Sequence, residues 1–289
     1  HRQAGKPPDG NESYAPFVKD WTVQGMLDVY NALSGMAKDG QVPPGLAGTT
    51  TLSFMEGAPQ SPSMTPLAVR RMSLSEEPWD RPGSWAHASG KSGFFGECSQ
   101  DDNGHDQVVV YDDALLGGNG DSAEGVTLGE ATIIHELGHA IQLGGTPGAE
   151  AEVRSREDQL RMAEWSSLSR WTEPGNLLAD GRMGAFEYYY DPTVQVGHRQ
   201  EIATSYGASD PCEDFAEYTP FFFKDPETAM KLSLEKFLYL NQLVGDYYEA
   251  GQIVQMAASL GFDESRLQSA EQGMRAKVAA APAEAGLVV

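Results

Sequence analysis

Residues 127–143 read TLGEATIIHELGHAIQL, and this stretch decides how the chain around it folds. Thr127 is followed three positions later by Glu130, a capping box that predicts the start of a helix. Two glycines at 144 and 145 predict its end near Leu143. One side of this helix carries apolar residues at helical spacing, which we expect to be buried: Ile133, Leu137, Ala140 and Ile141.

The segment His135-Glu136-Leu137-Gly138-His139 in this helix has the H-E-x-x-H spacing of zinc enzymes. Residues four apart lie one turn apart on the same helix face, so the imidazoles of His135 and His139 can reach one ion. Glu136 is rotated by one step from His135, which places its carboxylate beside the metal. There it can act as general base and take a proton from the activated water. The sequence therefore predicts one catalytic zinc ion.

A catalytic zinc site needs a third protein ligand. The metzincin extension requires Gly at 142 and His at 145, whereas this chain has Gln142 and Gly145, so that class is excluded. Downstream, Glu213 and Glu217 lie one turn apart on a predicted helix. We predict Glu213 as the ligand and Glu217 as the acceptor for a ligand histidine. Because Glu213 follows a predicted N-cap, Asp210, by three residues, completing a capping box is its alternative role.

The segments Thr204-Ser205-Tyr206-Gly207 and Glu213-Asp214-Phe215-Ala216-Glu217 resemble the catalytic domain of the anthrax lethal factor type of gluzincin, and clostridial Pro-Pro endopeptidases are similar at the same places. In those families a tyrosine precedes the ligand glutamate by seven positions, as Tyr206 precedes Glu213. The resemblance implies Glu213 as third zinc ligand, with Glu217 supporting a histidine. It implies Tyr206 as the phenol that stabilises the oxyanion or protonates the leaving amine. It also implies that strand 107–111 is the active-site edge, where a polypeptide substrate pairs as an added strand.

Three other interpretations of the site stay open. Deuterolysin-like enzymes use an aspartate as third ligand, which makes Asp210 or Asp214 the fallback. A non-catalytic binding or toxin protein would keep zinc only as a structural staple. Such a site is normally closed by a fourth protein ligand. No Cys or His stands at helix-neighbour spacing to supply one, which leaves Cys98 or Cys212 as the alternative. A zinc hydrolase acting on a non-peptide amide would carry the same motif.

The predicted fold class is α+β and zincin-like: a small mixed sheet with an active-site edge strand packed on the zinc helix, followed by a mainly helical C-terminal part. We expect a metalloprotease domain over 105–279, an N-terminal region over 1–104 and a loose tail over 280–289. The apolar spacing of Trp21, Met26, Leu27, Tyr30 and Leu33 predicts an amphipathic helix over 18–36. Further predicted elements are strands over 49–55 and 107–111, a loop-rich part over 57–104, and helices over 149–169, 213–222 and 226–244. We expect the residues that determine substrate specificity in the long 144–200 insertion and in the N-terminal region.

The 289 residues carry 42 acidic and 20 basic side chains, a net charge of -22. This charge repels phosphate backbones and anionic lipid, so we expect neither nucleic acid nor a membrane as partner. No apolar run approaches the ~18 residues of a membrane span. The chain begins at His1, as a processed chain would, and we expect a secreted monomer. Its two cysteines, Cys98 and Cys212, predict one disulfide in an exported chain.

Overall fold

The computed structural model describes residues 22–38, 68–72, 96–100, 106–111, 125–143, 151–169, 171–172, 187–188, 201–204, 206–207 and 211–287. The predicted strand over 49–55 and the predicted cap Asp210 lie outside these residues. The chain falls into two compact units, 1–42 with 46–140 and 43–45 with 141–289, and the domain boundaries expected from the sequence stay a prediction. No helix in the part of the chain that the structure describes combines the length and apolar character that a membrane span requires.

In the first unit, helix α1 covers Val23–Met36 and begins at Thr22, whose hydroxyl accepts a hydrogen bond from the Gly25 amide at 3.0 Å. The predicted helix is confirmed from Val23, but its predicted apolar face is wrong. Met26 and Tyr30 are 50% and 68% exposed. The helix instead buries small residues and a carboxylate: Gly25, Asp28, Val29, Ala32 and Met36. The inward face therefore depends on a polar partner for Asp28, which apolar periodicity does not reveal.

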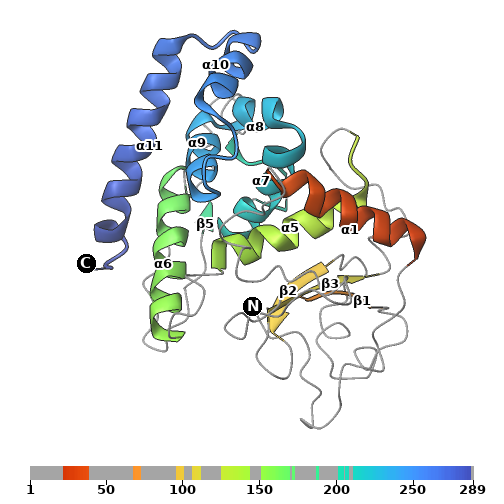
Figure 1. The fold of residues 1–289 in the computed structure, drawn as a ribbon. Helices are drawn as coiled ribbons and strands as arrows, with labels where there is room; N and C mark the ends of the chain where they lie inside the picture. Colours follow the sequence, from red (N-terminus) through yellow and green to blue (C-terminus); the bar gives the residue numbers. More distant parts are fainter. Residues whose placement is uncertain are drawn as a thin grey trace. The chain divides into compact units, whose positions relative to one another are not determined.

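Three short strands of the first unit form a mixed sheet: β1 (Ala68–Met72), β2 (Gly96–Gln100) and β3 (Asp106–Tyr111) (Figure 1). β3 lies in the middle, parallel to β1 and antiparallel to β2. Val108 pairs with Val69 on one side and Cys98 on the other, and it is fully buried. The small mixed sheet and the strand over 107–111 are thus confirmed, and the region read as loop-rich holds two strands.

The prediction that strand 107–111 forms the active-site edge is wrong. Residues 107–110 of β3 are paired on both sides, with β1 and with β2, so their backbone N–H and C=O groups are already used. A substrate strand cannot be added to it. Any added strand would have to pair with β1 or β2, the edge strands of this sheet.

Helix α5 covers Leu128–Leu143, as the capping box predicts. The Thr127 hydroxyl accepts a hydrogen bond from the Glu130 amide at 3.1 Å and donates one to Asp28 Oδ1 of α1 at 2.8 Å. The four apolar residues expected to be buried are at most 6% exposed, which confirms them. Burial continues around the helix from Gly129 to Gln142, so the histidine face also lies in the interior.

The second unit is mainly helical (Figure 1). Its elements are α6 (Ala151–Ser167), α7 (Pro211–Lys224), α8 (Pro226–Leu232), α9 (Leu234–Leu243), α10 (Ala250–Ser259) and α11 (Glu264–Glu284), with a short ladder of β4 (Trp171–Thr172) and β5 (Glu187–Tyr188). The helix predicted over 226–244 is two helices. Ser233, with φ -161°, interrupts it, and its hydroxyl caps α9 by accepting a hydrogen bond from the Lys236 amide.

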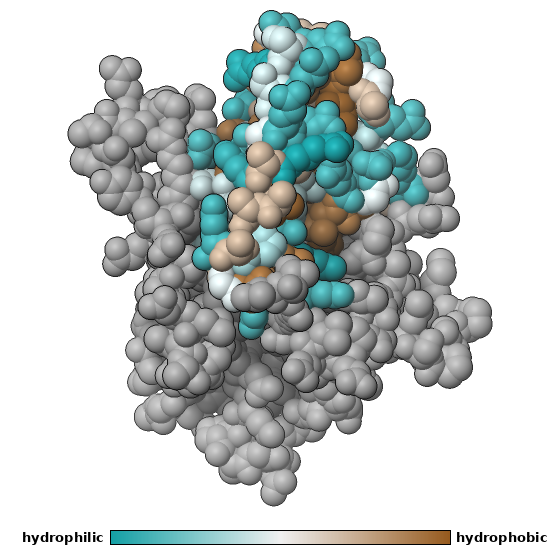
Figure 2. All heavy atoms as spheres, turned by 90° about the vertical axis from the view of Figure 1, so that its left-hand side faces the viewer, coloured by the Kyte–Doolittle hydropathy of each residue, from teal (hydrophilic) through white to brown (hydrophobic). Residues whose placement is uncertain are grey.

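Helix α11 covers 280–284, the first half of the predicted tail. It buries Leu267, Met274 and Ala281, which repeat every seven residues and form one seam along the helix. It packs on α6 and α9. Among the described residues on the face that Figure 2 shows, hydrophilic side chains predominate, with apolar areas between them. Ala281 is 2% exposed and the helix continues to Glu284. The prediction of a loose tail is therefore wrong for residues 280–284.

Candidate metal centre

Helix α5 brings His135, Glu136 and His139 together in the interior of the first unit. Their exposed fractions are 8%, 5% and 3%, and one ligand atom from each lies within 4.8 Å of the others. The two imidazole rings meet edge to face, with centroids 4.8 Å apart. His135 Nε2 lies 3.9 Å from Glu136 Oε1. The structure therefore confirms the cluster that the H-E-x-x-H spacing predicts.

The donor atoms of this cluster fit a metal ion. Two imidazole nitrogens and a carboxylate are the ligand types that zinc takes in proteins. Burying ionisable groups is costly unless they are paired or coordinate a metal, and α5 gathers three of them within one turn. A divalent cation would compensate this cost, so the residues present are compatible with a zinc site.

Helix α7 of the second unit carries Glu213 in its first turn and Glu217 one turn later. Most of α7 is buried. Its partly exposed residues form a single stripe at helical spacing, and they are Glu213, Glu217, Phe221 and Lys224. The prediction that both glutamates share one helix face is thus confirmed. Their proposed roles as ligand and supporting residue stay predictions.

The segment 201–207 lies against α7 at Glu217. The Thr204 hydroxyl donates a hydrogen bond to Glu217 Oε2 at 2.5 Å and accepts one from the Gly207 amide at 3.0 Å. A Cβ on Gly207 would stand 3.3 Å from Glu217 Cβ and 3.4 Å from Asp214 Cα, so glycine favours this close approach. Tyr206, within the segment, is 52% exposed. The two motifs that carry the family resemblance are therefore spatial neighbours.

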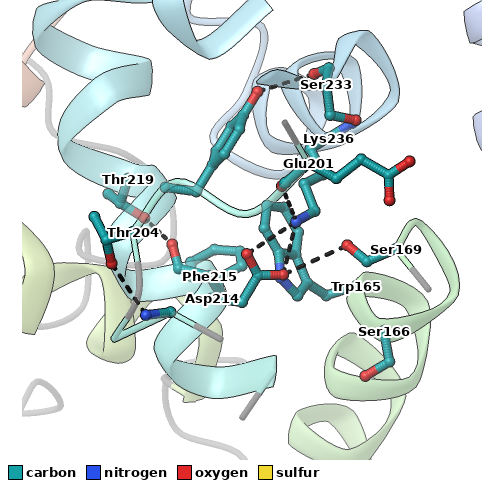
Figure 3. Close-up of polar contacts among 12 residues, drawn as sticks. Trp165, Ser166, Ser169, Glu201, Thr204, Asp214, Phe215, Thr219, Ser233 and Lys236 are labelled. Carbon is teal, nitrogen blue, oxygen red and sulfur yellow. Dashed lines mark hydrogen bonds and ion pairs between the residues drawn. The ribbon is translucent and has the colours of Figure 1, made fainter. Parts of the chain in front are cut away.

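Asp214 is buried in an ion pair with Lys236, and both side chains are fully buried (Figure 3). Lys236 Nζ lies 2.9 Å from Asp214 Oδ1 and 2.7 Å from Oδ2. Oδ2 also accepts hydrogen bonds from Trp165 Nε1 at 3.0 Å and Ser169 Oγ at 3.5 Å. Burial lowers the pKa of Lys236, and the Asp214 carboxylate opposes that shift. Because both oxygens of Asp214 are occupied, its environment disfavours it as the alternative third ligand.

Lys236 also reaches the segment 201–207, since its ammonium donates a hydrogen bond to the Glu201 carbonyl oxygen at 2.7 Å. Neither Lys236 nor the Thr204 hydroxyl has a role predicted from the sequence. Thr204 stands two residues before Tyr206 in the same motif, and this position could have indicated it. Lys236 stands 22 residues after Asp214 in an ordinary helical pattern, so nothing local marks it.

The expected disulfide between Cys98 and Cys212 is wrong, because Cys212 is a buried thiol. Its Sγ lies 3.7 Å from Met162 Sδ, and Gln142 Nε2 lies 3.9 Å from the same sulfur. The thiol is thus packed between α6 and α7 as a small apolar group.

Comparisons with models of known families, with curated proteins and with solved structures found no match to this chain.

Proposed function

We propose that this protein is a secreted zinc-dependent endopeptidase of the gluzincin type with a zincin-like catalytic fold. The observation that carries the proposal is the buried cluster of His135, Glu136 and His139 on one turn of α5. An ordinary buried helix has no reason to gather two imidazoles and a carboxylate, whereas metal-assisted hydrolysis needs this set.

In this proposal His135 and His139 hold zinc together with Glu213. The choice of Glu213 rests on the sequence motif and is supported by two features of α7. Glu213 lies on the stripe that is not fully buried, and its neighbour Asp214 is already bound to Lys236. Glu217 supports a ligand histidine, while its other contact, Thr204, orients its carboxylate.

When bound, zinc supplies Lewis-acid chemistry that polarises the scissile carbonyl and lowers the pKa of water towards ~7. Glu136 accepts the proton of the attacking water and delivers it to the departing amine. The Tyr206 hydroxyl donates a hydrogen bond to the carbonyl oxygen as negative charge grows there. Tyr206 is 52% exposed, which is compatible with a contact to substrate.

The test is zinc content and peptide cleavage by the full chain and its variants. We expect one zinc per chain in the wild type and in Glu136→Gln, with cleavage at least ~100-fold slower in the variant because the general base is lost. His139→Ala and Glu213→Ala should bind zinc much more weakly. Glu130→Gln, the same substitution in the same helix but outside the motif, is the matched control and should retain activity.

Three other outcomes of these measurements would change the assignment. Full zinc retention in Glu213→Ala would move the third ligand elsewhere, Asp210 first. Zinc without cleavage of any denatured protein would favour a structural zinc site or a non-peptide substrate. A wild-type protein that binds no zinc would refute the proposal.

A further inference from the structure

Lys236 joins two parts of the second unit that are distant in the sequence. From the first turn of α9 its ammonium contacts both oxygens of Asp214 on α7 and the main-chain carbonyl oxygen of Glu201 (Figure 3). The ammonium also lies 4.9 Å from the centre of the Trp165 ring. An ammonium has three protons to donate, and these three oxygens accept them.

This arrangement is costly to build. Each buried ion loses its hydration, and a well-packed apolar pair at the same place is often as stable or more stable. Stability alone therefore does not explain a fully buried Lys–Asp pair. What an apolar pair would lack is the hydrogen bond to Glu201, where the segment 201–207 begins.

Two further contacts hold the segment 201–207 on α7. The Thr204 hydroxyl bonds Glu217, and Gly207 lies against the backbone of α7. Tyr206 is placed between these two contacts. The position of its phenol relative to Glu217 thus depends on the segment staying on α7.

We propose that Lys236 is a positioning residue, which ties the segment 201–207 to α7 and thereby fixes Tyr206 and Thr204 beside Glu217. The catalytic part of this inference rests on the proposed function. The tether itself is a property of the second unit and can be tested without any activity.

The main variant is Asp214→Asn with Lys236→Met. Lys236→Met alone leaves a buried carboxylate without its cation, which would destabilise the protein by itself. The double variant removes both charges, keeps an amide oxygen for Trp165 and keeps most of the volume. Gly207→Ala is an independent variant, because its Cβ would stand 3.3 Å from Glu217 Cβ, so that the segment and α7 must shift slightly apart to accommodate it. Tyr239→Phe is the control, since it removes a buried hydroxyl of the same helix that bonds Glu164 and not the segment.

The first measurement is amide hydrogen exchange of the zinc-free full chain. We expect faster exchange over 201–207 in the double variant and in Gly207→Ala, with α7 and α9 still protected, and no change over this segment in Tyr239→Phe. Unchanged exchange over 201–207 in the double variant would overturn the tether, whatever the activity.

The second measurement is kcat and KM with zinc bound. In the double variant and in Gly207→Ala we expect kcat to fall about 10- to 100-fold, with zinc content retained and KM changed far less. The reason is that a misplaced oxyanion donor affects mainly the transition state. Faster exchange with an unchanged kcat would overturn the catalytic role. If the wild type cleaves no peptide, the proposed function and the catalytic role both fail, and the exchange result alone still decides the tether.

Discussion

Among single residues, Glu164 joins α6 to α9, because its Oε2 accepts a hydrogen bond from the Tyr239 hydroxyl at 2.8 Å. Burial raises the pKa of Glu164 above its ordinary value of 4.5, against the opposing effects of the Tyr239 hydrogen bond and the positive charge of Arg161. The charged side chains of α6 therefore include groups that hold helices together. Arg161 likewise donates a hydrogen bond to the Ile141 carbonyl oxygen at 2.9 Å.

The raised pKa of Glu164 predicts a pH effect with a defined sign. The folded protein binds this proton more tightly than the unfolded chain does. The contribution of Glu164 to the free energy of unfolding should therefore increase as pH falls through the folded pKa towards 4.5, and be lost as pH rises above it.

Urea unfolding of the zinc-free wild type and Glu164→Gln between pH 4.5 and 7.5 measures this contribution. The stability of the wild type relative to the variant should rise towards the acidic end. A difference that stays constant, or that falls on acidification, would contradict the assignment.

At the scale of elements, the start of α5 is held by the hydroxyl of Thr127. It caps the helix at Glu130 and reaches Asp28 on α1, so one side chain fixes two helices. We expect Thr127→Val to lower the free energy of unfolding by about 1–2 kcal/mol, because the cap is lost. Thr127→Ser keeps the hydroxyl and should lose little. Chemical denaturation distinguishes the two variants, and equal stability of Thr127→Val and wild type would show that the cap contributes nothing.

For the whole molecule, metal binding and folding should be coupled. An ion that binds only the folded chain stabilises it by about 4 kcal/mol at a thousandfold excess over Kd. Removing zinc with a chelator should therefore lower the Tm of the wild type by several degrees, and adding zinc back should restore it. His135→Ala should show no shift with either treatment. A chelator that leaves the wild-type Tm unchanged would argue against a bound structural or catalytic metal.

Several features could be predicted from the sequence because they depend on neighbours within one or two helical turns. The start of α5 followed from Thr127 and Glu130, and the His135–Glu136–His139 cluster followed from a spacing of four. The common face of Glu213 and Glu217 has the same origin. In each case helix geometry alone brings the groups together, so no distant partner has to be known.

Other features were decided by partners far away in the chain. β3 became a central strand because β1 and β2, two weakly patterned segments, pair with both its sides. α1 buries Asp28, whose Oδ1 accepts hydrogen bonds from Gln24 on the same helix and from Thr127, 99 residues later. Met162, 50 residues before Cys212, packs on its thiol.

The sequence by itself therefore determined the helix that carries the candidate metal ligands and the chemistry these ligands can support. The tertiary structure alone decided which strand is central, which face of α1 is buried, and that Lys236 binds Asp214 and the Glu201 carbonyl. The physical reason is that burial of a polar group is stable only with a matching partner, and that partner is chosen by three-dimensional packing and not by spacing along the chain.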